Sequence, residues 1–242
     1  MQAHRPKSSP ARSPETPQTG KGFDPSVNPY STWVHEHPDT LLAEPSPEDL
    51  AARIAPAIAE GAQVVVDLGC GSGGYLLQAA TMHPQRIHIG FELRFKRLVK
   101  SARKIEKAGL DRVWFLRDLA EQFPRYFGPG QVWRVHVNFP DPWPKKGQWK
   151  KRLIQKPFLR EVARTLAPGG RFCLKTDHSG YFLHVLEVIQ GLPELRPRVC
   201  RNDLHRQDLY TEGIRTEFEG LFLSKNKPVY YLEMEKPRNP AP

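Results

Sequence analysis

Cysteine is scarce in this chain, and long hydrophobic segments are missing. The three cysteines, Cys70, Cys173 and Cys200, are too few and too scattered for a disulfide framework, and none has the spacing of a cysteine or histidine metal site. No apolar run approaches the roughly 20 residues that a membrane helix needs, and the N-terminus lacks the apolar core of a signal peptide. These absences predict a cytoplasmic protein with no metal and no membrane partner.

Acidic residues are in the minority. The 242 residues include 26 Asp and Glu against 36 Lys and Arg, a formal net charge of +10. Such an excess favours a polyanionic partner, because each phosphate that a cation neutralises releases counterions. Solubility alone would also explain the excess, so the positions of the cations have to decide between the two interpretations.

The chain divides into a tail and one domain. Residues 1–29 hold six prolines and almost no large apolar side chain, which predicts a disordered Pro-rich tail because such a segment cannot bury a core. Residues 30–242 are predicted to form a single domain, a length that suits one α/β unit. The sequence leaves the choice between a monomer and a homodimer open.

From Pro47 onward, short apolar runs typical of buried parallel strands alternate with helical patterns. This alternation indicates a doubly wound α/β fold, with a mostly parallel seven-stranded sheet and helices on both faces. Ligands bind such sheets outside the carboxyl ends of the strands. The predicted strands are Gln63–Leu68, Arg86–Phe91, Arg112–Leu116, Val132–Val137, Arg171–Thr176, Arg196–Val199 and Val229–Met234. The predicted helices are Pro47–Glu60, Gly74–Met82, Phe95–Ala108, Leu119–Tyr126, Ile154–Leu166 and Tyr181–Gln190.

A glycine-rich loop follows the first predicted strand and precedes a helix. It reads Asp67-Leu-Gly-Cys-Gly-Ser-Gly-Gly74, and its glycines let the backbone turn sharply and approach a ligand closely. Gly69, Gly71 and Gly74 also satisfy the dinucleotide pattern, with Glu92 as the acid at a suitable distance. The loop alone therefore leaves the type of nucleotide cofactor open.

Three acids stand at the tips of successive predicted strands. Asp67 would repel a pyrophosphate but attract a cationic amino group, such as that of S-adenosylmethionine. Glu92 can accept from two ribose hydroxyls, and Asp118 from an adenine amino group. Each acid alone could instead cap a helix or complement its N-terminal charge. Their occurrence at three strand ends favours one acidic cofactor crevice.

The fourth predicted strand runs into a proline-rich and basic segment. This segment, Asn138–Arg152, is called the arm. Its three alternate prolines, Pro140, Pro142 and Pro144, exclude a helix there and predict a stiff, extended conformation that can hold Asp141 at low entropic cost. Lys145–Arg160 contains seven cations, with Trp143 and Trp149 next to them, a pattern typical of phosphate contact and base stacking. A second basic run, Arg94–Lys107, equally suits a solvated helix face.

Three motifs make the chain resemble the bacterial tRNA (guanine-N7-)-methyltransferase family over roughly Trp33 to Glu233. They are Asn-Phe-Pro-Asp-Pro-Trp-Pro-Lys-Lys at Asn138–Lys146, Leu-Lys-Thr-Asp at Leu174–Asp177 and Thr-Glu-Phe-Glu at Thr216–Glu219. Two positions depart from the family pattern. Glu217 stands where the family usually has Lys, and Asp67 stands where it often has Glu.

The resemblance implies a class I, Rossmann-like methyltransferase domain with S-adenosylmethionine as cofactor and tRNA as partner. The methyl group would go to N7 of a guanine in the variable loop of the tRNA. Asp141 is the candidate catalytic residue. Cofactor-binding candidates are Asp67, Gly69, Gly71, Glu92, Asp118 and Asp141. Substrate- and RNA-binding candidates are Lys145, Gly147, Gln148, Trp149, Lys150, Lys151, Arg152, Asp177, Thr216, Glu217, Phe218 and Glu219.

Guanine N7 has a lone pair and no proton, so it can attack a sulfonium methyl group without a general base. Asp141 is expected to hold the Watson–Crick edge of the guanine, with Asp177 as a second acceptor. Asp141 could instead be a turn residue, and Thr216–Glu219 could simply be a helix capping box. The rival functions are a methyltransferase acting on another RNA base or a small molecule, a nicotinamide dehydrogenase, and a non-catalytic RNA-binding protein.

Overall fold

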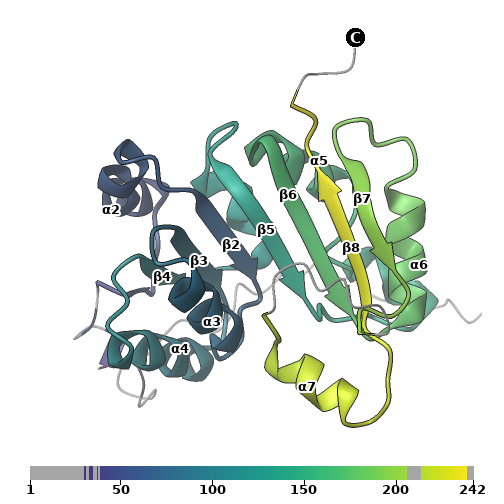
Figure 1. The fold of residues 1–242 in the computed structure, drawn as a ribbon, viewed down its shortest axis with the longest axis horizontal. Helices are drawn as coiled ribbons and strands as arrows, with labels where there is room; N and C mark the ends of the chain where they lie inside the picture. The colour runs from purple at the N-terminus through teal and green to yellow at the C-terminus, as the bar shows by residue number, and fades with distance from the viewer. Residues whose placement is uncertain (1–29, 31–32, 35–36, 38, 206–213, 239–242) are drawn as a thin grey trace, which may run out of the picture.

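The computed structural model describes residues 30, 33–34, 37, 39–205 and 214–238, so the predicted Pro-rich tail lies outside the described residues (Figure 1). The strands are β1 (Leu41–Leu42), β2 (Val64–Leu68), β3 (Ile87–Phe91), β4 (Val113–Leu116), β5 (Val132–Asn138), β6 (Leu166–Thr176), β7 (Arg196–Arg201) and β8 (Tyr230–Glu235). The α-helices are α2 (Pro47–Ala59), α3 (Gly74–Met82), α4 (Phe95–Lys107), α5 (Lys156–Thr165), α6 (Ser179–Val188) and α7 (Glu217–Leu223). Two 3₁₀ helices are η1 (Ala120–Tyr126) and η2 (Lys146–Lys151).

The described strands form one sheet in the order β1-β4-β3-β2-β5-β6-β8-β7. The strands from β1 to β6 pair in parallel, whereas β8 runs antiparallel between β6 and β7. The prediction of a doubly wound, mostly parallel sheet is confirmed. Its count of seven strands is corrected to eight, because Leu41 and Leu42 add β1 beside β4. Two residues are too few to produce a periodic pattern in the sequence.

Helices cover both faces of the sheet, as Figure 1 shows. On one face, Leu50 of α2, Phe123 of η1, Leu159 of α5 and Tyr181 of α6 pack with inward-facing strand residues into the main core cluster. On the other face, α3 and α4 form a second cluster with β1 and β4. Because side chains alternate along a strand, this second face also receives the polar residues of the central strands.

Local sequence explains where several elements begin and how they differ from the predictions. Ser46 caps α2 as predicted, since its hydroxyl accepts from the Asp49 backbone N–H at 3.0 Å. The predicted helix Leu119–Tyr126 is a 3₁₀ helix with Pro124 inside it, a position that cannot donate a backbone hydrogen bond. The basic arm is not wholly extended, because residues 146–151 wind into η2 after the last proline.

Gly90, near the carboxyl end of β3, lets α3 approach the sheet closely. A β carbon at this position would lie 2.6 Å from Leu76 Cδ1 and 2.8 Å from Phe115 Cδ1. The glycine therefore brings the N-terminal half of α3, and the glycine loop before it, down onto the carboxyl end of the sheet.

Candidate functional site

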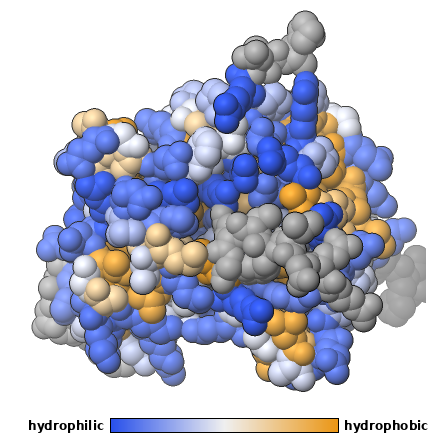
Figure 2. Space-filling model, in the orientation of Figure 1, coloured by the Kyte–Doolittle hydropathy of each residue, from blue (hydrophilic) through white to orange (hydrophobic). Residues whose placement is uncertain are grey.

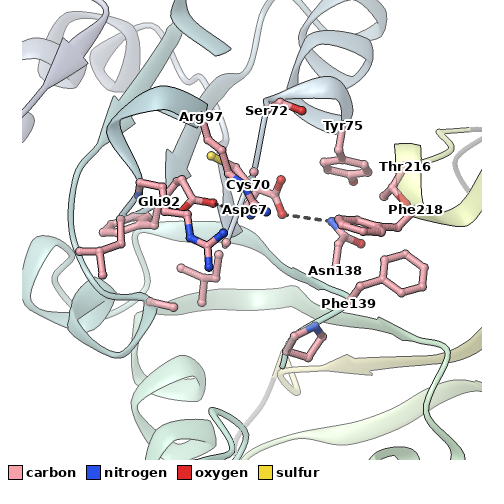
Figure 3. Close-up of a pocket in the computed structure, with 18 of the residues that line it drawn as sticks. Asp67, Cys70, Ser72, Tyr75, Glu92, Arg97, Asn138, Phe139, Thr216 and Phe218 are labelled. Atoms are coloured by element: carbon pink, nitrogen blue, oxygen red, sulfur yellow. Dashed lines mark hydrogen bonds and ion pairs between the residues drawn. The ribbon is translucent and has the colours of Figure 1, made fainter. Parts of the chain in front are cut away.

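A cavity of about 550 Å³ opens at the carboxyl ends of the central strands (Figure 3). It is lined by the glycine loop, by the residues that follow β3, β4 and β5, and by the first turn of α7. The four predicted acids all line this one cavity: Asp67, Glu92, Asp118 and Asp141. The strand topology thus brings together side chains that are up to 74 positions apart in the chain (141 − 67).

The glycine loop has a backbone that only glycine adopts easily. Gly69, Gly71 and Gly73 have φ angles of 79°, 58° and 72°, all in the left-handed region. A β carbon built on Gly69 or Gly71 meets no heavy atom within 4 Å. These two glycines therefore leave open space beside the cavity, which a ligand can approach against bare backbone.

Asp67 is buried at the end of β2, with only 1% of its surface exposed. Its Oδ1 accepts a hydrogen bond from Asn138 Nδ2 at 3.0 Å, drawn as a dashed line in Figure 3. Burial raises the pKa of Asp67 to about 7, although the Asn138 hydrogen bond and the positive charge of Lys175 act in the opposite direction. A cationic ligand at this carboxylate would favour its ionised form.

Glu92 directly follows β3 and is also buried. Its Oε1 accepts from the Arg94 backbone N–H at 2.9 Å, and its Oε2 lies 3.4 Å from an Arg97 guanidinium nitrogen. Because a carboxylate has about four acceptor positions, both oxygens keep capacity for further donors such as hydroxyl groups.

Asp118 is the most heavily engaged of the four acids. One oxygen accepts from the Leu119 backbone N–H at 2.8 Å, and the other accepts from the Tyr126 hydroxyl at 2.6 Å. Arg125 lies 3.9 Å from the second oxygen. These contacts fit the local structural role that the sequence offered as the alternative for this acid, and its contact with an adenine remains a prediction.

The arm after β5 is shaped by two residues with unusual backbones and by one buried cation. Phe139 and Trp143 have φ angles of 53° and 43°, which bulky side chains rarely adopt. Arg152 is 2% exposed, and its Nε donates to the Pro142 carbonyl at 2.9 Å. Its guanidinium also lies over the rings of Trp149 and Tyr181, at 4.5 and 5.1 Å from the centroids.

Most of the arm's predicted RNA-binding residues are accessible, but one is not. Lys145, Gly147, Lys150 and Lys151 are exposed, as is the candidate catalytic residue Asp141, whereas Gln148 and Trp149 are half-buried. Arg152 differs from the expectation that it lies against RNA, because it is enclosed by the arm that it holds. Asp177 is half-buried between β6 and α6 and does not line the cavity.

The motif at residues 216–219 forms the N-terminal end of α7, which Figure 1 places below the carboxyl ends of the central strands. Thr216 and Glu219 form the capping box that the sequence allowed: each side chain accepts from the other residue's backbone N–H, at 3.0 and 3.1 Å. Thr216, Glu217 and Phe218 line the cavity. Glu219 is fully buried, which differs from the expectation that it contacts the target nucleotide.

Glu217 connects α7 to the opposite wall of the cavity. Its carboxylate accepts from the Ser72 hydroxyl at 2.9 Å and pairs with Lys104 of α4 at 3.0 Å, and these two contacts lower the pKa of Glu217. Lys104 also donates to the Ser72 carbonyl at 2.9 Å. Glu217, which stands where the family usually has lysine, thus connects α7 to the glycine loop.

Three residues that the structure places at or under the cavity were not among the site candidates predicted from the sequence, although Asn138 begins one of the family motifs. Asn138 holds Asp67, and the Tyr75 hydroxyl lies 3.0 Å from Nε2 of the buried His136. Figure 3 shows Tyr75 and Asn138 on the same side of the cavity as Phe218, opposite Glu92 and Arg97. Only strand alternation could have indicated the face that Asn138 and His136 occupy, and no spacing distinguishes Tyr75 from other core residues of α3.

Among the residues that the structure describes, no three or more His, Cys, Asp or Glu side chains are grouped in a way that could hold a metal ion. None of the helices in the same ranges combines the length and apolar character needed to cross a bilayer.

Comparison with known proteins identifies the relatives of this chain. Residues 61–232 match the family model described as putative methyltransferase. A bifunctional glycosyltransferase/methyltransferase from Fusobacterium nucleatum is 37% identical over 72% of this chain, which spans 27% of that relative's length. A tRNA (guanine-N(7)-)-methyltransferase from Geobacillus kaustophilus is 33% identical, over 80% of this chain and 88% of the relative.

Solved structures support the fold. The crystal structure of the 16S rRNA methyltransferase KamB matches with a TM-score of 0.58 at 21% identity, covering 77% of this chain and 93% of that chain. The residues that the family model matches include all those that line the cavity. The chain therefore belongs to the tRNA (guanine-N(7)-)-methyltransferase family, whose members include that Geobacillus relative.

Proposed function

We propose that this protein transfers a methyl group from S-adenosylmethionine to N7 of a guanine in the variable loop of tRNA, and that it acts in the cytoplasm. The observation that carries the proposal is the convergence of Asp67, Glu92, Asp118 and Asp141 on one cavity beside the glycine loop. The proposal also draws on relatives that bear the name tRNA (guanine-N(7)-)-methyltransferase.

The residues around the cavity fit S-adenosylmethionine. A cavity of about 550 Å³ lies within the usual range for a small-molecule site, and Gly69 and Gly71 leave room for a ligand against the backbone. The carboxylate of Asp67 would bind the amino group of the cofactor, and Glu92 would accept from its ribose hydroxyls. When bound, the cofactor supplies an electrophilic methyl group on a positively charged sulfur.

Asp141 is the residue proposed to hold the target guanine. It stands on the proline-stiffened arm at the rim of the cavity, where its carboxylate can accept from the N–H groups on the Watson–Crick edge of a guanine. A base held in this way supplies the proximity that the reaction needs, and N7 itself requires no proton acceptor. The negative charge of Asp141 also favours the positive charge that develops on the purine ring.

Apolar side chains provide a second boundary of the cavity. Phe139 and Phe218 both line it, with ring centroids 6.1 Å apart, and Phe218 is 50% exposed. Figure 2 shows apolar residues over α7, and further apolar patches at the left and right of the same face. An unstacked purine can pack against such rings, which is how proteins hold single bases of folded RNA.

The exposed cations of the arm provide the surface for the RNA backbone. Lys145, Lys146, Lys150 and Lys151 are exposed directly after Asp141. Arg152 holds this basic segment in place through its hydrogen bond to the Pro142 carbonyl and its contact with the Trp149 ring. Binding of tRNA is therefore expected to weaken steeply with salt, because each phosphate contact releases counterions.

The deciding experiment incubates the protein with bulk unmodified tRNA and methyl-labelled S-adenosylmethionine, followed by mapping of the labelled base. We expect label on N7 of a variable-loop guanine and none after ribonuclease treatment of the tRNA. Label on another base, or on a small molecule, would contradict the assignment. NAD in place of S-adenosylmethionine is expected to leave the melting temperature unchanged.

Asp141→Ala tests the proposed role of the acid. It is expected to lower turnover by about 10²-fold or more while changing the affinity for S-adenosylhomocysteine by less than about threefold. Asp111→Asn, at an exposed acid outside the cavity, is the matched control and is expected to behave like the wild type. Equal losses of turnover and cofactor affinity in Asp141→Ala would remove Asp141 from the catalytic role.

A further inference from the structure

Lys175 is a buried cation that the proposed chemistry does not use. It lies at the carboxyl end of β6 and is 7% exposed. Its Nζ donates to Glu219 Oε2 at 2.9 Å and to the Ile214 carbonyl at 3.0 Å. Buried ion pairs contribute little net stability, because the desolvation of both charges offsets their attraction. A pair in this place therefore calls for an explanation other than stability.

Through its ion pair with Glu219, Lys175 is connected to the first turn of α7, which lines the cavity. Glu219 belongs to the capping box of α7, since its Oε2 also accepts from the Thr216 backbone N–H at 3.1 Å. His205 lies 2.9 Å from its Oε1. The first turn of α7 provides Thr216 and Phe218 to the cavity lining. The ammonium group of Lys175 thus fixes the helix end that closes one side of the cavity.

Through the sheet, the same lysine reaches Asp67. Lys175 is the register partner of Asn138 in the parallel pair of β5 and β6, and Asn138 donates to Asp67 at 3.0 Å. The positive charge of Lys175 lowers the pKa of Asp67 against the effect of burial. One ammonium group therefore acts on both Asp67 and Glu219, which are 152 positions apart in the chain (219 − 67).

The other titratable groups near Asp67 do not replace this charge. Burial raises the pKa of the Cys70 thiol and of the Tyr75 hydroxyl, and lowers the pKa of His136, so all three are neutral around pH 7. Glu92 and Arg97 lie across the cavity and pair with each other. Strand β6 also carries Arg171, but Arg171 is the register partner of Arg134, four residues before Asn138 on β5, whereas Lys175 is the register partner of Asn138 itself.

We propose that Lys175 is a positioning residue of the methyl-donor site, which couples the first turn of α7 to the carboxylate of Asp67. The inference rests on the proposed function, because it takes Asp67 as the partner of the donor's amino group. Lys175 touches neither the donor nor the guanine in this account. Its positive charge favours the ionised form of Asp67, and its contact with Glu219 holds the first turn of α7 in position.

The test measures the dissociation constant of S-adenosylhomocysteine by isothermal titration calorimetry between about pH 6 and about pH 8. Each variant is compared with the wild type at the same pH, so that titration of the ligand's own amino group affects both equally. For the wild type, affinity is expected to rise with pH as Asp67 ionises. Lys175→Met removes the charge and keeps the length, so the midpoint of this rise is expected to move up by about one pH unit or more. The variant should bind about tenfold more weakly at about pH 6 and only about twofold more weakly at about pH 8.

Glu219→Gln is the second variant, and it decides the question if Lys175→Met fails to fold by circular dichroism. It leaves the charge of Lys175 uncompensated, so the midpoint is expected to move down rather than up. Lys236→Met is the matched control, because Lys236 also donates to a backbone carbonyl, that of Leu166, but outside the cavity lining. It should leave the pH profile unchanged.

The outcomes separate the two proposals. If the wild type does not bind S-adenosylhomocysteine at any pH, both the proposed function and this inference are wrong. If the wild type binds but Lys175→Met weakens binding by the same factor at every pH, the lysine has a merely structural role and only this inference is overturned. A shift of the midpoint in one direction by both Lys175→Met and Glu219→Gln would overturn this inference as well.

Discussion

Replacing Asp67 by asparagine is expected to stabilise the unliganded protein at alkaline pH, although it removes the group proposed to bind the donor. Burial raises the pKa of Asp67 from its ordinary value of 3.8 to about 7. The folded protein therefore holds this proton more tightly than the unfolded chain does. The stability that the protonated group contributes is complete below about pH 4 and is lost as the pH rises to about 7.

The magnitude follows from these two pKa values. A shift from 3.8 to about 7 corresponds to a loss of about 4 kcal/mol over the whole titration, and about 3 kcal/mol of it falls between about pH 5 and about pH 8. Asparagine does not titrate, and its carbonyl oxygen can still accept from Asn138. The variant should therefore escape this part of the wild type's pH dependence.

Urea denaturation of the unliganded proteins at about pH 5 and about pH 8 measures the effect. Relative to the wild type, Asp67→Asn should gain about 2 to 3 kcal/mol more at the higher pH than at the lower one. Asp39→Asn is the control, because its carboxylate is 99% exposed and its removal should show no such difference. Parallel pH profiles for Asp67→Asn and the wild type would refute the reasoning that burial makes this carboxylate costly.

Three further substitutions test the packing and the contacts around the cavity. Gly90→Ala should lower the free energy of unfolding by about 1 to 3 kcal/mol in urea denaturation, because its β carbon would lie 2.6 Å from Leu76 Cδ1; wild-type stability would contradict this packing. Glu217→Lys should weaken S-adenosylhomocysteine binding about two- to threefold in calorimetry, and adding Lys104→Glu should restore it; a double variant as weak as the single one would argue against the ion pair. Arg152→Lys should raise the KM for tRNA about tenfold without changing S-adenosylhomocysteine affinity, since lysine lacks the fork that holds the arm; an equal loss of that affinity would count against the assignment.

The topology of the sheet made the cavity predictable from the sequence. Asp67, Glu92 and Asp118 each follow an apolar run, and a parallel sheet places such positions along one edge. The glycines of the loop also indicated a sharply turning backbone, and Gly69 and Gly71 have the left-handed φ angles that such a turn requires. For these residues, the position along the chain already determines the position in space.

The sequence does not show which charged side chains are buried. Arg152 and Glu219 belong to motifs that contain exposed charges, but each points into the protein and satisfies backbone groups or an opposite charge there. Their burial depends on long-range partners such as Tyr181 and Lys175, which no local periodicity reveals. The short strand β1 was missed for the same reason, because its pairing with β4 is its only signal.

The shape of the arm after β5 has a consequence for protein engineering. Phe139 and Trp143 adopt left-handed backbone conformations that cost of order 1 to 3 kcal/mol each, so their own preferences do not maintain this shape. The buried guanidinium of Arg152, seated between Trp149 and Tyr181, supplies the restraint from outside the motif. If Asn138–Lys146 were transplanted onto another sheet, the loop would therefore keep its sequence but adopt a different conformation. To preserve the conformation, Arg152 and the rings of Trp149 and Tyr181 would have to be transplanted as well.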